Sequence, residues 1–229
     1  TNQFSLVYER FVLKWLLHYV EDKLDPDQFG GRKGHAVTHY LIEVQNAILY
    51  NLDLDKPFAT LMTAIGIEKG FNKIEHNQVV TRLSDLNCPG WLLKIVCSYL
   101  KGRSLTVRWQ SKQSRKLPLN SGSGQGTILG LFLFCVTFNG AGPKPHTEPL
   151  GKTITQPRRR RQPIQRGKKK WVDDLTLTVP IKLKDKLTQD PGPPLMLPED
   201  RNGMQSELLS LNQYCLESKI SINQNKSRC

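Results

Sequence analysis

Two adjacent aspartates inside an apolar segment constrain this chain more than any other feature. Residues 171–179 (WVDDLTLTV) place Asp173 and Asp174 among apolar and β-branched residues. This pattern predicts a β-hairpin with both acids at its turn. Paired carboxylates at a tight turn lie close enough to share hard divalent cations such as Mg²⁺, which prefer oxygen ligands. An ordinary solvated turn is the alternative interpretation of the doublet taken by itself.

Composition and charge limit the class of protein. The chain has 229 residues, 38% of them hydrophobic, and a formal net charge of +13. That apolar content is sufficient for a sizeable core, and the charge favours a polyanionic partner, either nucleic acid or a membrane surface. No apolar run reaches the ~18 residues that a membrane span needs. No N-terminal segment resembles a signal peptide, so we expect no membrane association and an intracellular location, in the cytoplasm or the nucleus.

The five cysteines are odd in number and widely separated, without the spacing of metal ligands. They predict reduced thiols with a structural role.

Hydrophobic periodicity predicts most of the elements. We expect helices at residues 4–24, 37–48, 79–86, 91–99 and 204–215, an apolar segment at 127–138, and strands at 58–66, 104–109 and 219–222. Residues 190–203 are rich in Pro and Gly and predict a loop.

Residues 139–170 predict a basic loop or insertion. Within 144–170 there are ten Lys and Arg residues and one Glu. The runs Arg158–Arg161 and Lys168–Lys170 suit contact with a nucleic-acid backbone. A disordered charged loop and a nuclear-localisation patch are the alternatives.

A second motif is the small-residue loop Ser121–Gly130 (SGSGQGTILG). Glycines let a backbone approach a flat ligand closely because they lack the Cβ atom that would clash. A flexible turn is the alternative interpretation. The order of the pieces is more informative than any one of them: buried strand, helices, Gly-Gln-Gly loop with helix, then the Asp-Asp hairpin.

In this order the motifs resemble the reverse transcriptase domain of non-LTR retrotransposons, and the resemblance covers nearly the whole chain. Residues 28–34 (QFGGRKG) resemble the fingers motif, and 65–76 (IGIEKGFNKIEH) resemble the first catalytic motif of the palm. Residues 121–130 resemble the Pro-Gln-Gly motif, 171–174 the Tyr-x-Asp-Asp hairpin, and 223–226 the Asn-x-x-Lys motif.

The resemblance implies an α+β fold of the right-hand polymerase type. Residues 1–57 would form a helical, fingers-like region, and 58–229 a palm whose antiparallel sheet is backed by helices, with the thumb absent. It also implies RNA-directed DNA synthesis from a DNA primer on an RNA template. Deoxynucleoside triphosphates would be the substrates, with Mg²⁺ or Mn²⁺ as cofactor. The oligomeric state is left open.

Site residues follow from the resemblance by position. Asp173 and Asp174 would be catalytic metal ligands, and Gln125 and Gly126 would line the site of the template and incoming nucleotide. Phe71 falls at the aromatic steric gate for the sugar, with core packing as the alternative. The remaining positions are basic: Lys226 near the triphosphate, or simply a surface lysine, and Arg32 and Lys33 on backbone or triphosphate.

One expected ligand is missing, because Gly66 stands where the family has its first catalytic aspartate. Removing a group that bridges both cations lowers the rate of phosphoryl transfer by orders of magnitude. Glu68 lies on the same face of a strand and is a possible substitute. Other departures are Gly70 for Ala, Asn72 for Asp, Gly124 for Pro and Trp171 for Tyr or Phe, and the two glycines Gly66 and Gly70 weaken the strand-to-helix junction.

These departures predict impaired polymerisation. The alternatives are a non-catalytic RNA- or DNA-binding remnant, a domesticated protein, and a basic structural protein without a specific ligand. The central spatial expectation is that Gly66 lies beside Asp173 and Asp174 at the ends of adjacent strands.

Overall fold

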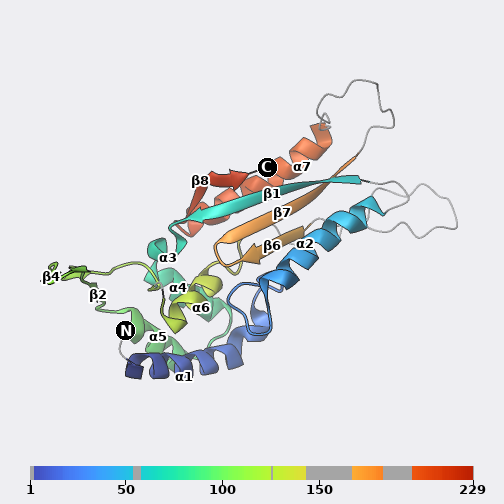
Figure 1. Ribbon diagram of the computed structural model, residues 1–229. Helices are drawn as coiled ribbons and strands as arrows, with labels where there is room; N and C mark the ends of the chain where they lie inside the picture. Colours follow the sequence, from blue (N-terminus) through green and yellow to red (C-terminus); the bar gives the residue numbers. More distant parts are fainter. Residues whose placement is uncertain (1–2, 54–57, 125, 143–166, 183–197, 229) are drawn as a thin grey trace.

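The computed structural model describes residues 3–53, 58–124, 126–142, 167–182 and 198–228 (Figure 1). Its helices are α1 Gln3–Val20, the 3-10 helix η1 Glu21–Lys23, α2 Val37–Leu52, α3 Gly70–Lys73, α4 His76–Asp85, α5 Gly90–Leu100, α6 Ile128–Thr137 and α7 Pro198–Glu217. Its strands are β1 Phe58–Glu68, β2 Ser104–Leu105, β3 Arg108–Trp109, β4 Lys112–Gln113, β5 Leu117–Pro118, β6 Gly167–Trp171, β7 Asp174–Lys182 and β8 Ser221–Arg228.

The main sheet has four antiparallel strands in the order β6-β7-β1-β8. Strand β1 lies inside the sheet and pairs with β7 along nearly its whole length, from Phe58 opposite Lys182 to Gly66 opposite Asp174. Apolar and β-branched residues favour so long a strand, because they pack well on both faces of a covered sheet. The sheet therefore joins segments that lie more than a hundred positions apart in the sequence.

Both faces of the sheet are covered, which explains the weak polarity of its inner strands. Leu175 and Leu177 of β7 are fully buried and belong to the core formed with the helices. Thr176, on the opposite face, is also buried, and its hydroxyl lies 2.5 Å from the hydroxyl of Tyr40 on α2. Helix α2 therefore covers the second face of the sheet (Figure 1).

Helix α6 is buried on all sides and forms the centre of the helical layer. Its apolar residues pack with Val12, Leu16 and Val20 of α1 and with Ile65 and Ile67 of β1 in one continuous core. The N-terminus of α6 is capped from another helix: the buried carboxylate of Glu9 accepts hydrogen bonds from the backbone amides of Ile128 (2.8 Å) and Leu129 (3.1 Å).

The mixed helical and antiparallel architecture confirms the predicted α+β class. The predicted helices and strands are present, with different ends. Helix α7 begins at Pro198, inside the segment predicted as loop, because Pro is tolerated at the first position of a helix. Strand β8 runs to Arg228, beyond the predicted end at 222. The predicted strand 104–109 divides into β2 and β3, which pair with β5 and β4.

One element prediction was wrong. Residues 167–170 were expected inside a basic loop, yet they form β6 and pair with β7. A run of lysines normally indicates exposure to solvent, so it did not predict a strand. In the structure alternate lysines are buried: Lys168 is 5% exposed and Lys170 is 0% exposed. Arg158–Arg161 lie outside the described residues.

The predicted boundary at residue 57 stays a prediction, and the core draws on residues from both sides of it. In the described part of the chain, no helix is long and apolar enough to cross a bilayer. The four described cysteines are free thiols, three of them buried.

Candidate active site

Three strands bring one row of residues together across the sheet. Gly66 of β1 lies directly opposite Asp174 of β7 on one side and Asn223 of β8 on the other. Directly opposed residues share a face of the sheet. The backbone amide of Ile67 also donates to the carbonyl of Asp173 (3.1 Å). The expectation that Gly66 lies beside the paired aspartates is therefore confirmed.

The hairpin turn that carries the aspartates is tight. Trp171 pairs with Asp174, so Val172 and Asp173 alone make the turn. Val172 has a φ of 57°, which matches the positive φ that two-residue hairpins need but is costly for a β-branched residue. Packing holds it there: a Cβ atom on Gly30 would lie only 2.5 Å from the Val172 side chain, so the fingers motif touches the turn directly.

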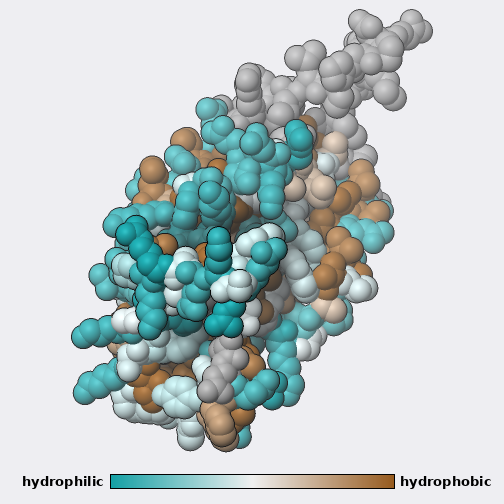
Figure 2. Space-filling model, turned by 60° about the vertical axis from the view of Figure 1, so that its left-hand side comes forward, coloured by the Kyte–Doolittle hydropathy of each residue, from teal (hydrophilic) through white to brown (hydrophobic). Residues whose placement is uncertain are grey.

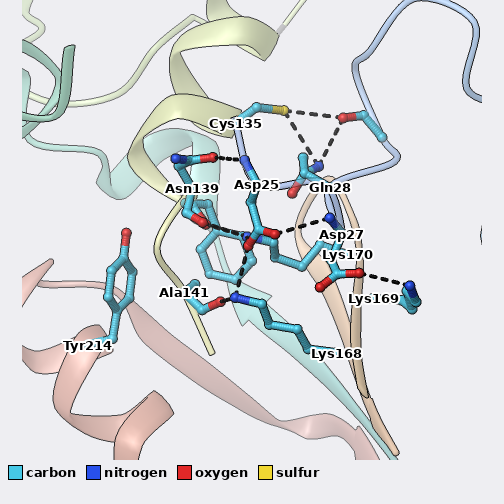
Figure 3. A network of polar contacts seen from close by, with 12 residues as sticks. Asp25, Asp27, Gln28, Cys135, Asn139, Ala141, Lys168, Lys169, Lys170 and Tyr214 are labelled. Atoms are coloured by element: carbon cyan, nitrogen blue, oxygen red, sulfur yellow. Dashed lines mark hydrogen bonds and ion pairs between the residues drawn. The ribbon is translucent and has the colours of Figure 1, made fainter. Parts of the chain in front are cut away.

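A buried charged network anchors the hairpin to the segment before the fingers motif (Figure 3). The ammonium group of Lys170 donates to Asp25 Oδ2 (2.7 Å) and to the carbonyls of Phe138 (3.1 Å) and Asn139 (2.8 Å). Lys168 forms a second ion pair with Asp25 Oδ2 (2.9 Å). These contacts satisfy the buried ammonium groups, which would otherwise be unfavourable inside the protein.

The pKa values reflect this burial. Burial opposes ionisation of Asp25, but Lys170 and Lys168 outweigh it and hold the pKa of this carboxyl below its usual value. Burial lowers the pKa of Lys170 to about 8, against the attraction of Asp25. Both groups are therefore charged at neutral pH.

The third lysine faces the other side of β6. Lys169 pairs with Asp27 (2.8 Å) and Glu43 (3.4 Å), so it links the segment before the fingers motif to α2. Contact with a nucleic-acid backbone was one interpretation of Lys168–Lys170. It is wrong for Lys168 and Lys170, which are buried, and it stays a prediction for Lys169, which is partly exposed.

A pocket of about 360 Å³ opens beside the row of opposed residues. It is lined by Ile67, Glu68, Lys69, Gly70, Phe71, Asn72, Asp173, Asn223 and Lys226. A Cβ atom added to Gly66 would lie 3.8 Å from Asp174 Oδ1 and 3.1 Å from Lys226 Cβ. A side chain at position 66 would therefore project to the carboxylate of Asp174.

Asp174 has the electrostatics of a cation ligand. Burial and the negative charge of Asp173 raise its pKa, while Lys226 opposes the shift. Two carboxylates that repel each other are stabilised by a divalent cation, so Asp173 and Asp174 fit such an ion. Within the described residues there is no group of three His, Cys, Asp or Glu side chains that could hold a metal. Asp173 and Asp174 are thus two candidate ligands, and Gly66 beside them has no side chain to contribute.

Glu68 lines the same pocket, but its carboxylate is engaged. It forms an ion pair with Lys73 (2.9 Å), and that hydrogen bond with its charge holds the pKa of Glu68 below the usual value. Lys73 also donates to the Ser221 hydroxyl of β8 (3.1 Å). A cation that recruited Glu68 would have to compete with Lys73.

Phe71 both packs and lines the pocket. Its ring stacks on Phe134 of α6 with centroids 4.6 Å apart, and the side chain is half-buried. The neighbouring Gly70 has no room for a side chain, because a Cβ atom there would lie 2.6 Å from the Phe134 ring. The departure from Ala at position 70 thus fits the place that Phe134 occupies.

Asn223 begins the Asn-x-x-Lys motif, and its structural role was not predicted from the sequence. Its side-chain oxygen accepts hydrogen bonds from the backbone amides of Asn225 (3.1 Å) and Lys226 (3.2 Å). This turn accompanies a register shift in the pairing of β8 with β1, and it brings the stem of Lys226 against Gly66. The Asn-x-x-Lys spacing was the available signal for this role.

The glycine-rich loop borders the pocket through backbone hydrogen bonds. The amides of Gly122 and Ser123 donate to the carbonyls of Ile74 (2.8 Å) and Phe71 (3.0 Å). Gly126 is exposed with a φ of 84°, and Gln125 lies outside the described residues. The ligand roles of both stay predictions.

The two basic residues of the fingers motif do not line the pocket. Arg32 is directed inward, where its guanidinium pairs with Glu21 (3.0 Å) and donates to the carbonyl of Asp25 (3.2 Å). Lys33 is exposed. The structure therefore joins Asp173, Phe71 and Lys226 around one pocket beside Gly66 and Asp174, apart from Arg32, Lys33 and Gly126.

The chain is similar to known proteins in its sequence and in its fold. No protein-family model matches the chain. Over 152 residues, 66% of the chain, the sequence is 28% identical to a protein of Drosophila melanogaster described as a probable RNA-directed DNA polymerase from transposon X-element. The chain spans 16% of the length of that relative.

The fold resembles that of an apo telomerase from Candida tropicalis truncated from its C-terminal domain. The TM-score is 0.57, with 10% sequence identity, and the match covers 98% of this chain and 40% of that one. At this identity the likeness concerns the fold. The ordered motifs, the similarity to a transposon polymerase and the shared fold together support a reverse transcriptase domain.

Proposed function

We propose that the chain derives from a non-LTR retrotransposon polymerase that adds deoxynucleotides to a DNA primer on an RNA template, and that Gly66 impairs this activity. One observation carries the proposal. Gly66 lies opposite Asp174 in the sheet, and a Cβ atom at position 66 would lie 3.8 Å from the Asp174 carboxylate. The position is thus oriented for a third carboxylate that this chain lacks.

The residues around the pocket would bind the cation and different parts of the nucleotide and template. Asp173 and Asp174 would hold Mg²⁺ or Mn²⁺, which polarises a phosphoryl oxygen and stabilises the charge that develops during nucleotidyl transfer. Phe71, fixed by its stacking on Phe134, would pack against the sugar of the incoming nucleotide. Lys226 would lie near the triphosphate, and Gln125 and Gly126 would contact the template and nucleotide.

Substitution of Gly66 by Asp tests the proposal. In a primer-extension assay with an RNA template and a DNA primer, Gly66→Asp should extend faster than the native chain by about 100-fold, because one preorganised electrostatic contact is commonly worth that much. Lys226 must move by a few tenths of an ångström to admit the new side chain, which is feasible because it lies exposed on the edge strand β8.

Gly66→Asn is the matched control, since it has nearly the same size without the charge, and it should give no gain. The variant Gly66→Asp with Asp174→Asn should also give no gain. Equal extension by Gly66→Asp and Gly66→Asn, or persistence of activity without Asp174, would contradict the proposed site.

A second candidate function is non-catalytic binding of RNA or DNA. The net charge of +13 and the incomplete donor set favour it. It predicts salt-sensitive binding of nucleic acid without extension, both in the native chain and in Gly66→Asp.

A further inference from the structure

A two-stranded ribbon extends from the helical layer between α5 and the glycine-rich loop (Figure 1). Strand β2 pairs with β5 at its base, and β3 pairs with β4 near its tip. The backbone of Val107 and Ser114 connects the two pairs, since the Ser114 amide donates to the Val107 carbonyl (2.9 Å). Gln110, with a φ of 52°, begins the two-residue turn at the tip.

This ribbon is exposed and yet apolar in part. Between residues 104 and 118, every residue except Thr106 is exposed. Trp109 is 74% exposed, Val107 59% and Leu105 52%. A two-stranded ribbon without a core is only marginally stable by itself, and a concentration of exposed apolar residues commonly marks a binding surface.

The ribbon is also basic, and it contains no acidic residue that would balance its positive charge. Residues 101–118 contain six basic residues, Lys101, Arg103, Arg108, Lys112, Arg115 and Lys116, and no acidic residue occurs anywhere from 86 to 147. In the described part of the chain none of the six forms an ion pair. Hydrophilic residues gather over the side of the molecule from which the ribbon extends (Figure 2). Arg103 is half-buried over the Tyr99 ring, and the charges of the other five residues, which are exposed, are available to an external polyanion.

The pairing puts an aromatic ring and a cation on one face. Trp109 lies directly opposite Lys112, and Leu105 lies directly opposite Leu117. Directly opposed residues project from the same side of a ribbon. An exposed indole beside an ammonium group suits a nucleotide, whose base stacks on the ring while its phosphate meets the cation.

The base of the ribbon is connected to the pocket. The amide of Leu119 donates to the carbonyl of Arg103 (2.9 Å) and closes the ribbon. Directly after it, Ser121 donates from its hydroxyl to the carbonyl of Asn72 (3.2 Å), and Ser123 bonds to the carbonyl of Phe71. Phe71 and Asn72 both line the pocket. A strand held on the ribbon would therefore lead to the candidate active site.

We propose that the ribbon of residues 104–118 binds single-stranded nucleic acid outside the pocket, by stacking of a base on Trp109 and by contact of phosphates with Arg108 and Lys112. The choice of nucleic acid among polyanions rests on the proposed function. The stacking and charge contacts rest on the ribbon itself.

The test measures binding of the whole chain to fluorescent single-stranded RNA and DNA oligonucleotides by anisotropy. Trp109→Ala should raise the Kd about tenfold for a normal oligonucleotide, because stacking of one base on an aromatic ring is worth that much. It should leave unchanged the Kd for an abasic oligonucleotide of equal length. Phe11→Ala is the matched control, since Phe11 is an aromatic residue 63% exposed on α1.

The charges are tested with Arg108→Ala together with Lys112→Ala. Loss of two phosphate contacts on a single strand should reduce the slope of log K against log salt by about 1.4. The pair Arg10→Ala and Lys14→Ala removes the same charge from the exposed surface of α1 and should leave the slope unchanged. All of these side chains are exposed, so the variants should fold, which their unfolding curves would verify.

Each other outcome overturns the proposal in a distinct way. Equal weakening of normal and abasic oligonucleotides by Trp109→Ala would exclude base stacking. Unchanged binding by all ribbon variants would put the nucleic-acid surface elsewhere and leave the proposed function standing. A change in the molecular mass of the chain in solution on Trp109→Ala, without a change in Kd, would make the ribbon a contact between copies of the chain. If the native chain binds no oligonucleotide, the ribbon proposal fails, while extension by Gly66→Asp separately decides the proposed function.

Discussion

Asp174 is the residue whose protonation reports most directly on the candidate site. Burial and the charge of Asp173 raise its pKa, and Lys226 opposes them. Asp173→Asn should therefore lower the pKa of Asp174, because it removes one of the two causes that raise it. Lys226→Met should raise this pKa further. The shifts can be measured by NMR titration of the labelled carboxyl carbon.

The sign of the pH effect on cation binding follows from the same shift. A raised pKa means that protons compete with cations for Asp174 at a higher pH than for an ordinary aspartate. Mn²⁺ affinity should thus fall as the pH decreases toward the pKa of Asp174. An Asp174 pKa that does not respond to Asp173→Asn would contradict the proximity of the two carboxylates.

At the scale of elements, the position of the hairpin that carries Asp173 and Asp174 depends on Asp25. This carboxylate neutralises both Lys168 and Lys170, which β6 carries into the protein. Asp25→Asn keeps the shape but leaves two buried ammonium groups without a countercharge. It should lower the free energy of unfolding by about 3–5 kcal/mol, as loss of one partner of a buried ion pair commonly does. Urea denaturation measures the effect.

Asp22→Asn, at an exposed position in η1, is the control and should change stability by less than about 0.5 kcal/mol. The effect of Asp25→Asn should also depend on pH. The folded-state pKa of Asp25 lies below its ordinary value of 3.8, so its contribution is complete above that pH and is lost as the pH falls through the folded-state pKa. An equal loss of stability in both variants would show that the network is not specific.

Most helices and strands, but not all, could be predicted from the sequence. The hairpin, strand β1 and the helices were predictable, because their periodicity reflects burial on one or both faces. Strand β6 was not predictable, because Lys168 and Lys170 are buried by an ion pair with Asp25, some 145 positions away. Runs of charged residues normally indicate exposure to solvent. Only the folded structure shows that Asp25 lies beside these lysines.

The candidate site was predictable to the same extent. The proximity of Gly66 and the aspartates followed from motif order, and the Asn-x-x-Lys spacing was a local signal for Asn223. The inward pairing of Arg32 with Glu21, in contrast, is encoded by no local pattern.

For the whole molecule, the fold brings residues of β1 and β8, of the turn between β6 and β7 and of the segment after β1 to one pocket. The sheet joins β1, β7 and β8 at the row Asp174, Gly66 and Asn223. Helix α6 contacts Phe71 through Phe134, whose ring stacks on that of Phe71. This arrangement explains how a chain with a polymerase-like fold can have an incomplete set of carboxylates. We therefore predict that a single substitution completes the site.

Binding of Mn²⁺, followed by electron paramagnetic resonance, tests this claim most directly because it does not depend on primer, template or turnover. The native chain should bind weakly through Asp173 and Asp174, and Gly66→Asp should bind at least about tenfold more tightly, the equivalent of about 1.4 kcal/mol. Gly66→Asn should behave like the native chain, and Asp173→Asn with Asp174→Asn should abolish binding. Unchanged affinity in Gly66→Asp, or binding that survives the loss of both aspartates, would contradict the account.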